Sequence, residues 1–289
     1  MAELLKGKPV VDSMALDLRA RIEALGRAKV VPALALVRVG QRPDDLSYER
    51  TARKRAESLG IAIRPYELDE FAPQAAIEAA IHEVNRDENV HGCLLFRPLP
   101  SFVDESHMCE LLDPKKDIDG ITLASLASVF TDGHAGYPPA TAAACIQLLD
   151  HYQVPLQGKH VVVVGRSLVA GKPVSMMLLR RNASVTICHS KTENLADIMC
   201  SADVVICATG RARTFGAQFF GPGQTVLDVG INFDTQGNLG GDVDFAEVEP
   251  VVAAITPVPG GIGTVTTSVT MAHTVAAAEA ALAARTGRR

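Results

Sequence analysis

The chain has 289 residues and a net charge of −5, and this length leaves room for about two domains. No basic run accompanies the acidic balance, so the composition excludes an electrostatic surface for nucleic acid. The six cysteines form no C-x-x-C pair, which indicates buried thiols in a reducing compartment and no metal site or disulfide framework. The N-terminus lacks the apolar core of a signal peptide, and prolines and glycines interrupt the uncharged stretch 251–273. We therefore expect a cytoplasmic protein with no membrane segment.

The N-terminal half alternates helical and strand patterns. Apolar spacing predicts helices over 9–27, 45–59, 73–86 and 105–112, and strands over 32–39, 61–68 and 90–96. The last strand stops before Pro98–Pro100, because proline cannot continue a ladder of hydrogen bonds. A long helix over 141–152 is expected to join the two halves, and an alanine-rich helix over 267–285 is expected to pack back on the first domain.

The stretch from Lys159 to Pro173 predicts a strand, a glycine turn and a helix. Its first half is an unbroken β-branched run that is typical of a strand buried on both faces of a parallel sheet. Gly165 ends the strand, and Gly171 and Pro173 flank the start of the next helix. Such a turn directs free backbone N–H groups at a phosphate. The spacing is not G-x-G-x-x-G, so an ordinary strand-to-helix connection remains an alternative.

Further short strands are predicted over 184–188, 203–208, 225–229 and 253–256. Strands at this pitch, separated by helical patterns, predict a doubly wound parallel sheet with its ligand at the carboxyl ends of the strands. Arg166 follows the first strand and Ser190-Lys191 follow the second, so these residues are expected to flank an adenosine ribose. A cation and a hydroxyl there suit a 2′-phosphate and favour NADP, with NAD possible. The alternative for Arg166 is a solvated loop cation.

Several motifs occur in the order seen in one known family. They are Val39–Gly40 with Tyr48, Pro98–Pro100, Lys116–Gly120, Gly165–Ser167, Gly171–Pro173, Cys188–Thr192, Asp228–Asn232, Gly241–Val243 and Ile255–Gly261. On these residues the chain resembles, nearly end to end, the bifunctional methylenetetrahydrofolate dehydrogenase/methenyltetrahydrofolate cyclohydrolase family. The resemblance implies an α/β protein of two domains, with the pterin in the cleft between them and a homodimer formed through the nucleotide-binding domains.

The resemblance also implies domain limits and site residues. The N-terminal folate domain is expected over 1–141, with the helix 266–289 packed on it, and a Rossmann-like NADP-binding domain over 142–265. The implied cofactor-binding residues are Gly165, Arg166, Ser167, Gly171, His189, Ser190, Thr209, Gly210 and Ile231. The implied substrate-binding residues are Tyr48, Phe96, Pro98, Asp119, Pro259, Gly260 and Gly261, of which Tyr48 and Asp119 are also the catalytic candidates. Without the resemblance, Asp119-Gly120 reads as a simple turn.

The first domain departs from the family pattern at two linked positions. The family has a Lys four residues after the Tyr that packs on the pterin, and a Gln hydrogen-bonded to that Lys. Here Tyr48 is present, but the Lys position is Ala52 and the Gln position is Phe96. The segments Ala140–Ala142 and Gly263–Thr266 also differ from the family pattern near the expected substrate pocket.

No other cation in the sequence is expected to replace the missing Lys. On the predicted helix, Lys54 points away from the face of Tyr48 and Ala52. Arg55 lies further along the axis, and its guanidinium stays protonated and cannot act as a base. Strand alternation sends Arg97 to the other face of the sheet if the strand extends that far.

The chemistry of the two family reactions indicates which one this chain retains. Hydride transfer from the folate's N–CH2–N bridge needs binding and alignment, because the cofactor carries the reaction. Hydrolysis of the methenyl product needs a positioned acid/base group. We therefore expect NADP-dependent oxidation of 5,10-methylenetetrahydrofolate with weak or absent cyclohydrolase activity. The alternatives are a paralogue that acts on another one-carbon adduct or imine, and a folate- or NADP-binding protein without turnover.

Overall fold

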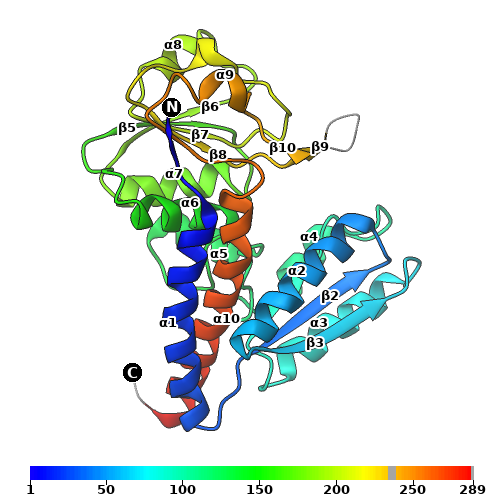
Figure 1. Cartoon of the computed structure of the whole chain (residues 1–289). Helices are drawn as coiled ribbons and strands as arrows, with labels where there is room; N and C mark the ends of the chain where they lie inside the picture. Colours follow the sequence, from blue (N-terminus) through cyan, green and yellow to red (C-terminus); the bar gives the residue numbers. More distant parts are fainter. Residues whose placement is uncertain (234–238, 288–289) are drawn as a thin grey trace. The chain divides into compact units, whose positions relative to one another are not determined.

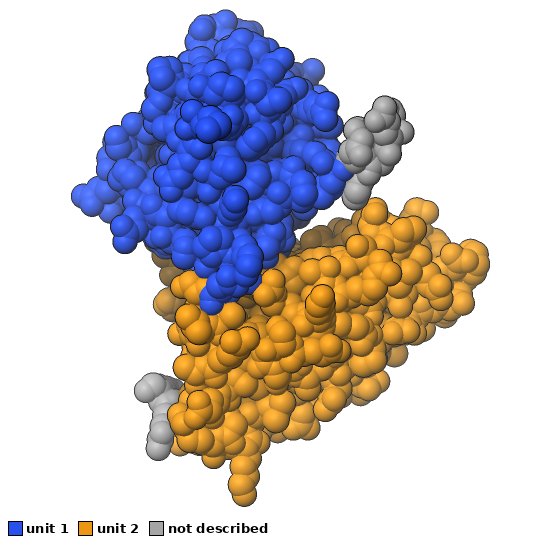
Figure 2. All heavy atoms as spheres, viewed as in Figure 1, with its two compact units in different colours: residues 1–12, 141–266 blue, residues 13–140, 267–289 orange. Residues whose placement is uncertain are grey.

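The computed structural model describes residues 1–233 and 239–287, and the chain folds into two compact units. Unit 1 contains residues 1–12 and 141–266, and unit 2 contains residues 13–140 and 267–289 (Figure 2). The chain passes between the units within three helices, α1 (Gly7–Arg27), α6 (Ala140–His151) and α10 (Ile262–Thr286). Within the described ranges, no helix has both the length and the apolar character needed to cross a membrane.

Unit 1 is built on a six-stranded parallel sheet, which confirms the predicted doubly wound domain (Figure 1). In spatial order the strands are β1 (Glu3–Leu4), β11 (Ala254–Ile255), β8 (Thr225–Asp228), β7 (Val204–Cys207), β5 (His160–Val164) and β6 (Ser184–Cys188). The apolar runs of β5 and β7 are buried, as expected for central strands that are covered on both faces.

Short helices and one hairpin complete unit 1. The helical segments are α7 (Gly171–Arg180), α8 (Leu195–Cys200), a 3-10 turn at Ala217–Phe219, and α9 (Phe245–Val248). The hairpin pairs β9 (Asn232–Phe233) with β10 (Leu239–Gly240) in antiparallel register. Side chains of α8, α9 and the 3-10 turn region pack on one face of the sheet around Val162, Val164 and Val205.

Unit 2 contains a parallel sheet of three strands with helices on both faces. Its strands, in spatial order, are β3 (Ala62–Leu68), β2 (Ala33–Val39) and β4 (Gly92–Leu95). Alternate residues of the fully buried β2 enter different cores, as the two-residue period of a strand requires. Leu34 and Leu36 pack with α1, α2 (Pro43–Leu59) and α10, whereas Ala35 and Val37 pack with α3 (Gln74–Arg86) and α4 (Glu105–Leu111).

The structure corrects the predicted arrangement at three points. Residues 1–12 belong to unit 1 and not to the N-terminal domain, because β1 pairs in parallel with β11 at the edge of the large sheet. A helix that the sequence analysis did not predict, α5 (Leu123–Thr131), begins at Thr122, whose side chain caps it by accepting from the Ser125 N–H. Cys200 is exposed, whereas the other five cysteines are buried thiols as expected.

Candidate functional site

The six-stranded sheet changes direction between β5 and β7. The chain goes from β5 to β6 on one side and then returns to place β7 on the other side. At such a point the connections after the two strands diverge and leave a crevice at their carboxyl ends. Gly165 and Arg166 follow β5, and Ala208 and Thr209 follow β7, so these four residues border the crevice.

Two glycines allow the chain segments at this crevice to approach one another closely. Gly165 has φ +139°, and a Cβ there would clash with the carbonyl oxygen of Ala208. A Cβ at Gly171, the first residue of α7, would clash with the carbonyl oxygen of Gly165. The glycines therefore bring β5, β7 and the N-terminus of α7 together, which is the arrangement that accommodates a phosphate.

An open pocket of about 260 Å³ occupies the crevice. Its lining includes six of the expected cofactor-binding residues, namely Gly165, Arg166, Ser167, His189, Ser190 and Thr209. The other three do not line it: Gly171 packs beneath Gly165, Gly210 lies beyond Thr209, and Ile231 is exposed after β8. A pocket that combines backbone turns, hydroxyls and cations at the carboxyl end of a parallel sheet fits a phosphate-bearing nucleotide.

The sequence analysis missed part of this pocket. Leu195, Arg211, Thr214 and Phe215 also line it, so the lining contains a second arginine in addition to Arg166. Arg211 follows β7 by four residues in an irregular loop, and loop residues carry no periodic pattern that could assign them to a site. The only available signal was its closeness in sequence to Thr209 and Gly210.

The Asp242 carboxylate holds the loop after β7 in place. It accepts hydrogen bonds from the Thr209 hydroxyl at 2.9 Å, the Gly210 N–H at 3.2 Å and the Arg211 N–H at 2.9 Å. Asp228 in turn accepts from the Asp242 N–H at 2.9 Å, and burial raises the pKa of Asp228 to about 7. Two buried carboxylates thus shape the pocket wall through the backbone, although neither lines the pocket.

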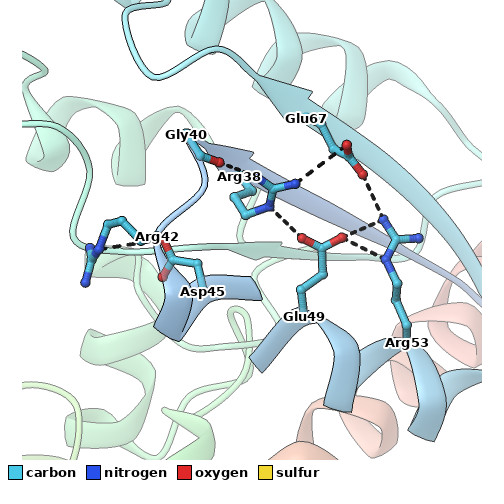
Figure 3. Close-up of polar contacts among 7 residues, drawn as sticks. All are labelled: Arg38, Gly40, Arg42, Asp45, Glu49, Arg53 and Glu67. Atoms are coloured by element: carbon cyan, nitrogen blue, oxygen red, sulfur yellow. Dashed lines mark hydrogen bonds and ion pairs between the residues drawn. The ribbon is translucent and has the colours of Figure 1, made fainter. Parts of the chain in front are cut away.

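In unit 2, an ion-pair network fixes helix α2 against the three-stranded sheet (Figure 3). Arg38 of β2 donates from Nε to Glu49 of α2 at 2.6 Å, and Arg53 of α2 donates from Nε to the same carboxylate at 2.7 Å. Arg53 also reaches Glu67 of β3 at 3.2 Å. Burial alone would raise the pKa of Glu49, but the hydrogen bonds from Arg38 and Arg53 hold that pKa below its usual value.

The network explains why α2 buries acidic residues that its sequence pattern did not predict. Asp45 and Glu49 lie on the buried face with Ala52, Ala56 and Leu59. Glu49 is satisfied by the two arginines, and breaking such a buried pair costs about 3–5 kcal/mol because it leaves a charge without a partner. The rotation of α2 about its axis, and with it the direction of Tyr48, is therefore fixed.

An apolar wall is formed by Tyr48 and Ala52 of α2 together with Phe96. Phe96 follows β4, is 5% exposed, and meets the Tyr48 ring edge to face with 6.0 Å between ring centroids. Ala52 is fully buried in the same core. Burial raises the pKa of Tyr48, the charge of Asp119 adds to this shift, and the nearby Thr267 side chain opposes it. Neither position at which the family resemblance implies a Lys and a Gln carries a group that can transfer a proton.

Asp119 lies in the loop after Asp117 and is half-buried. Burial raises the pKa of Asp119 to about 7, the charge of Arg97 opposes this shift, and the charge of Asp117 adds to it. Arg97 is therefore close enough to act on this carboxyl. Strand alternation would send Arg97 to the other face of the sheet only if the strand extended that far, and β4 ends at Leu95, so this condition is not met.

The remaining expected substrate residues lie in loops. Pro98 is exposed in unit 2, and its carbonyl accepts a hydrogen bond from Arg42 Nη1 at 2.9 Å. Pro259, Gly260 and Gly261 belong to unit 1 and follow β11. The Gly260 carbonyl accepts from the Gly7 N–H at 2.7 Å, which fixes this loop at the start of α1.

The fold and the crevice define a two-domain α/β protein with a pocket suited to a nucleotide at the carboxyl end of a parallel sheet. Two family models match the chain: the NAD(P)-binding domain of tetrahydrofolate dehydrogenase/cyclohydrolase over residues 139–282, and the catalytic domain of the same proteins over residues 5–119. The chain therefore belongs to the tetrahydrofolate dehydrogenase/cyclohydrolase family and is an enzyme of that family with an NAD(P)-binding domain.

Relatives and solved structures agree with this assignment. The chain is 47% identical over 281 residues to the bifunctional protein FolD of Carboxydothermus hydrogenoformans. The matched region covers 96% of the chain and 98% of the relative. It is similar to the crystal structure of the bifunctional FolD enzyme from Campylobacter jejuni, with a TM-score of 0.94, 33% identity, and coverage of 97% and 99%. The Trypanosoma brucei FolD complexed with NADP and an inhibitor gives a TM-score of 0.92 at 31% identity, with coverage of 97% and 98%.

Proposed function

We propose that this chain is an NADP-dependent 5,10-methylenetetrahydrofolate dehydrogenase with little or no cyclohydrolase activity. The observation that carries the proposal is the apolar wall of Tyr48, Ala52 and Phe96 beside Asp119, a carboxyl suited to bind a pterin. Family membership supports the folate substrate and the dehydrogenase reaction. The absence of a proton-transferring side chain at positions 52 and 96 distinguishes the two family reactions.

Oxidation of the folate needs no acid/base side chain from the protein. Bound NADP+ would supply the hydride acceptor, and the folate's own nitrogens would stabilise the cation left on the N–CH2–N bridge. The chain's residues bind and align the two reactants, which is where proximity contributes to the rate. Asp119 would accept from the amino-pyrimidine edge of the pterin, and Tyr48 would pack on the ring system. Neither role needs Ala52 or Phe96 to be polar.

Hydrolysis of the methenyl product makes a stronger demand, because protons must move around the tetrahedral intermediate. Asp119 is assigned to the pyrimidine edge, remote from the bridging carbon. The half-buried His273 donates from Nδ1–H to the Ile118 carbonyl at 2.8 Å, and burial lowers the pKa of His273 to about 4. An imidazole of that pKa is a weak base near neutral pH. We therefore assign hydrolysis at most a small rate.

NADP preference rests on the cations of the nucleotide pocket. Arg166 and Arg211 line it with Ser190, and among the described residues no acidic side chain contributes to the lining. Replacing Arg166 with Ala is expected to lower the NADP+ to NAD+ ratio of kcat/KM by roughly 10- to 100-fold, the usual worth of a hydrogen bond to a charged group. The matched control is Arg181→Ala, because Arg181 is exposed, pairs with Asp150 and lies outside the pocket. A wild type that favours NAD+, or an unchanged ratio in the Arg166 variant, would remove this assignment.

Two alternative functions have specific support. Ala52, Phe96 and the altered segment Gly263–Thr266 favour a paralogue that oxidises another one-carbon adduct or imine on the same scaffold. The intact nucleotide pocket and Asp119 are also compatible with a binder that does not turn over. Incubating the purified protein with 5,10-methylenetetrahydrofolate and either NADP+ or NAD+ separates the three. Reduction of the cofactor supports the proposed function. Binding of both ligands without reduction supports the non-catalytic binder, and failure to bind the folate supports the paralogue.

We also infer a homodimer formed through unit 1. Strand β6 is at one edge of the six-stranded sheet, and it exposes Ser184 and Ile187, the latter at 38%. The nearby α7 exposes Leu179 at 58%. An uncovered edge strand with apolar side chains favours pairing with a second chain. Sedimentation equilibrium tests this inference, since a monomer mass at micromolar concentration would contradict it.

A further inference from the structure

Two complementary polar groups lie near each other in unit 2 without protein partners. The Nε–H of Arg97 is buried and donates to no acceptor in the described part of the chain. The Asp119 carboxylate accepts no hydrogen bond from any described residue, although the charge of Arg97 acts on it. A buried donor without an acceptor is destabilising, so its presence needs an explanation, and a bound ligand that supplies the acceptor is one.

The neighbours of these two groups are already engaged elsewhere. Asp117 accepts from the N–H groups of Ile121 at 3.0 Å and Thr122 at 2.8 Å, so it is a structural carboxylate. Glu105 accepts from the Leu99 N–H at 2.7 Å and approaches Arg97 Nη1 only to 3.7 Å. That separation is too long for a hydrogen bond, so Glu105 steadies the guanidinium without satisfying it.

The chemistry of the pterin edge matches this pair of groups. Its 2-amino group and N3–H are two neighbouring donors, and the 4-oxo group beside them is an acceptor. A carboxylate can accept from both donors, and a guanidinium beside it can donate to the oxo group. We propose that Arg97 binds the 4-oxo group of the folate next to Asp119 and determines the specificity of this site for 4-oxo pterins. The inference rests on the proposed folate substrate and extends it to a residue outside the expected site.

Arg97 also has a predictable effect on the ionisation of Asp119. The other groups that face Asp119 are Asp117 from its own loop, Tyr48 from α2, and His273 from α10, which contacts the intervening Ile118. Because Arg97 is the positive charge in this set, its removal is expected to raise the pKa of Asp119 above about 7. The ionised form that accepts from the pterin would then persist only at higher pH.

The test measures kcat/KM for 5,10-methylenetetrahydrofolate against pH, at saturating NADP+, for wild type, Arg97→Leu and Arg97→Lys. The control is Arg86→Leu, because Arg86 is an exposed arginine at the end of α3 in the same unit. We expect wild-type kcat/KM to fall below pH 7 as Asp119 protonates. In Arg97→Leu this acidic limb of the pH profile, where kcat/KM falls, should move to a pH about one unit higher, and kcat/KM at pH 7.5 should fall about tenfold or more. Arg97→Lys keeps the charge and should keep the limb near its wild-type position.

Inhibition by folic acid and by aminopterin tests the contact through the difference between wild type and Arg97→Leu. Aminopterin has an amino group in place of the 4-oxo group and also lacks the N3–H from which Asp119 would accept, so only the change caused by the Arg97 substitution reports on Arg97. Wild type should bind folic acid more tightly than aminopterin, and Arg97→Leu should reduce this preference about tenfold. An unmoved acid limb together with an unchanged inhibitor preference in Arg97→Leu would overturn the role of Arg97. Failure of the wild type to oxidise the folate at all would overturn the proposed function instead.

Discussion

Replacing Ala52 with Lys and Phe96 with Gln together is expected to introduce measurable hydrolysis of methenyltetrahydrofolate. Each single change should do much less. Ala52 is fully buried in an apolar core, and Phe96 packs against Tyr48, so a Lys introduced alone would lose much of its charge to desolvation. A Gln at position 96 would give that Lys a hydrogen-bond partner, and neighbouring residues of this kind act together rather than additively. Acid/base catalysis of this type contributes about 10²–10⁴-fold.

The rate of methenyltetrahydrofolate hydrolysis is measured for wild type, both single variants and the double variant. The buffer-catalysed rate is subtracted from each. Dehydrogenase activity of each variant is measured alongside, because hydride transfer needs no proton-transferring group at positions 52 and 96. A thermal unfolding curve identifies any variant that the buried Lys destabilises. If Ala52→Lys alone restored as much hydrolysis as the double variant, the coupling between the two positions would be wrong.

Asp119→Asn is expected to weaken folate binding by about 2 kcal/mol, or roughly 30-fold. The amide replaces one acceptor with a donor, so one N–H of the pterin edge would face an N–H of the protein. NADP+ affinity should stay unchanged, because Asp119 belongs to unit 2 and the nucleotide pocket is lined by residues of unit 1. Isothermal titration with each ligand separately measures both affinities.

Asp119→Asn should also remove the acid limb of kcat/KM near pH 7, since an amide does not titrate in this range. In wild type the carboxyl gains a proton as the pH falls through its raised pKa, and folate binding is lost on that side. Unchanged folate affinity in the variant would show that Asp119-Gly120 is only a turn, or that the substrate is not a folate.

The features that the sequence predicted best are those that depend on local pattern. Five strands of the parallel sheet of unit 1, β5, β6, β7, β8 and β11, were predicted to within one or two residues, because buried parallel strands read as short β-branched runs between turn residues. Gly165 and Gly171 likewise indicated where chain segments approach closely at the nucleotide pocket, because a Cβ at either position would clash with a backbone carbonyl. These signals lie within a few residues of the structure that they specify.

Features set by distant contacts could not be predicted in this way. The two residues of β1 join unit 1 only because they pair with β11, more than two hundred residues later in the chain. Glu49 faces inward because Arg38 and Arg53 meet it there, against the polar appearance of its position. Asp242 shapes the nucleotide pocket through hydrogen bonds to a loop about thirty residues away. The direction of Arg97 depended on where β4 ends, and strand ends are poorly defined by sequence.

The most direct test of the account follows the two products of one wild-type reaction. Purified enzyme is mixed with 5,10-methylenetetrahydrofolate and NADP+, and reduced cofactor and methenyltetrahydrofolate are recorded separately over time. The account predicts one methenyltetrahydrofolate for each NADPH formed, decaying afterwards only at the buffer-catalysed rate. A methenyl yield that falls below the NADPH yield from the start, through hydrolysis faster than that background, would contradict it.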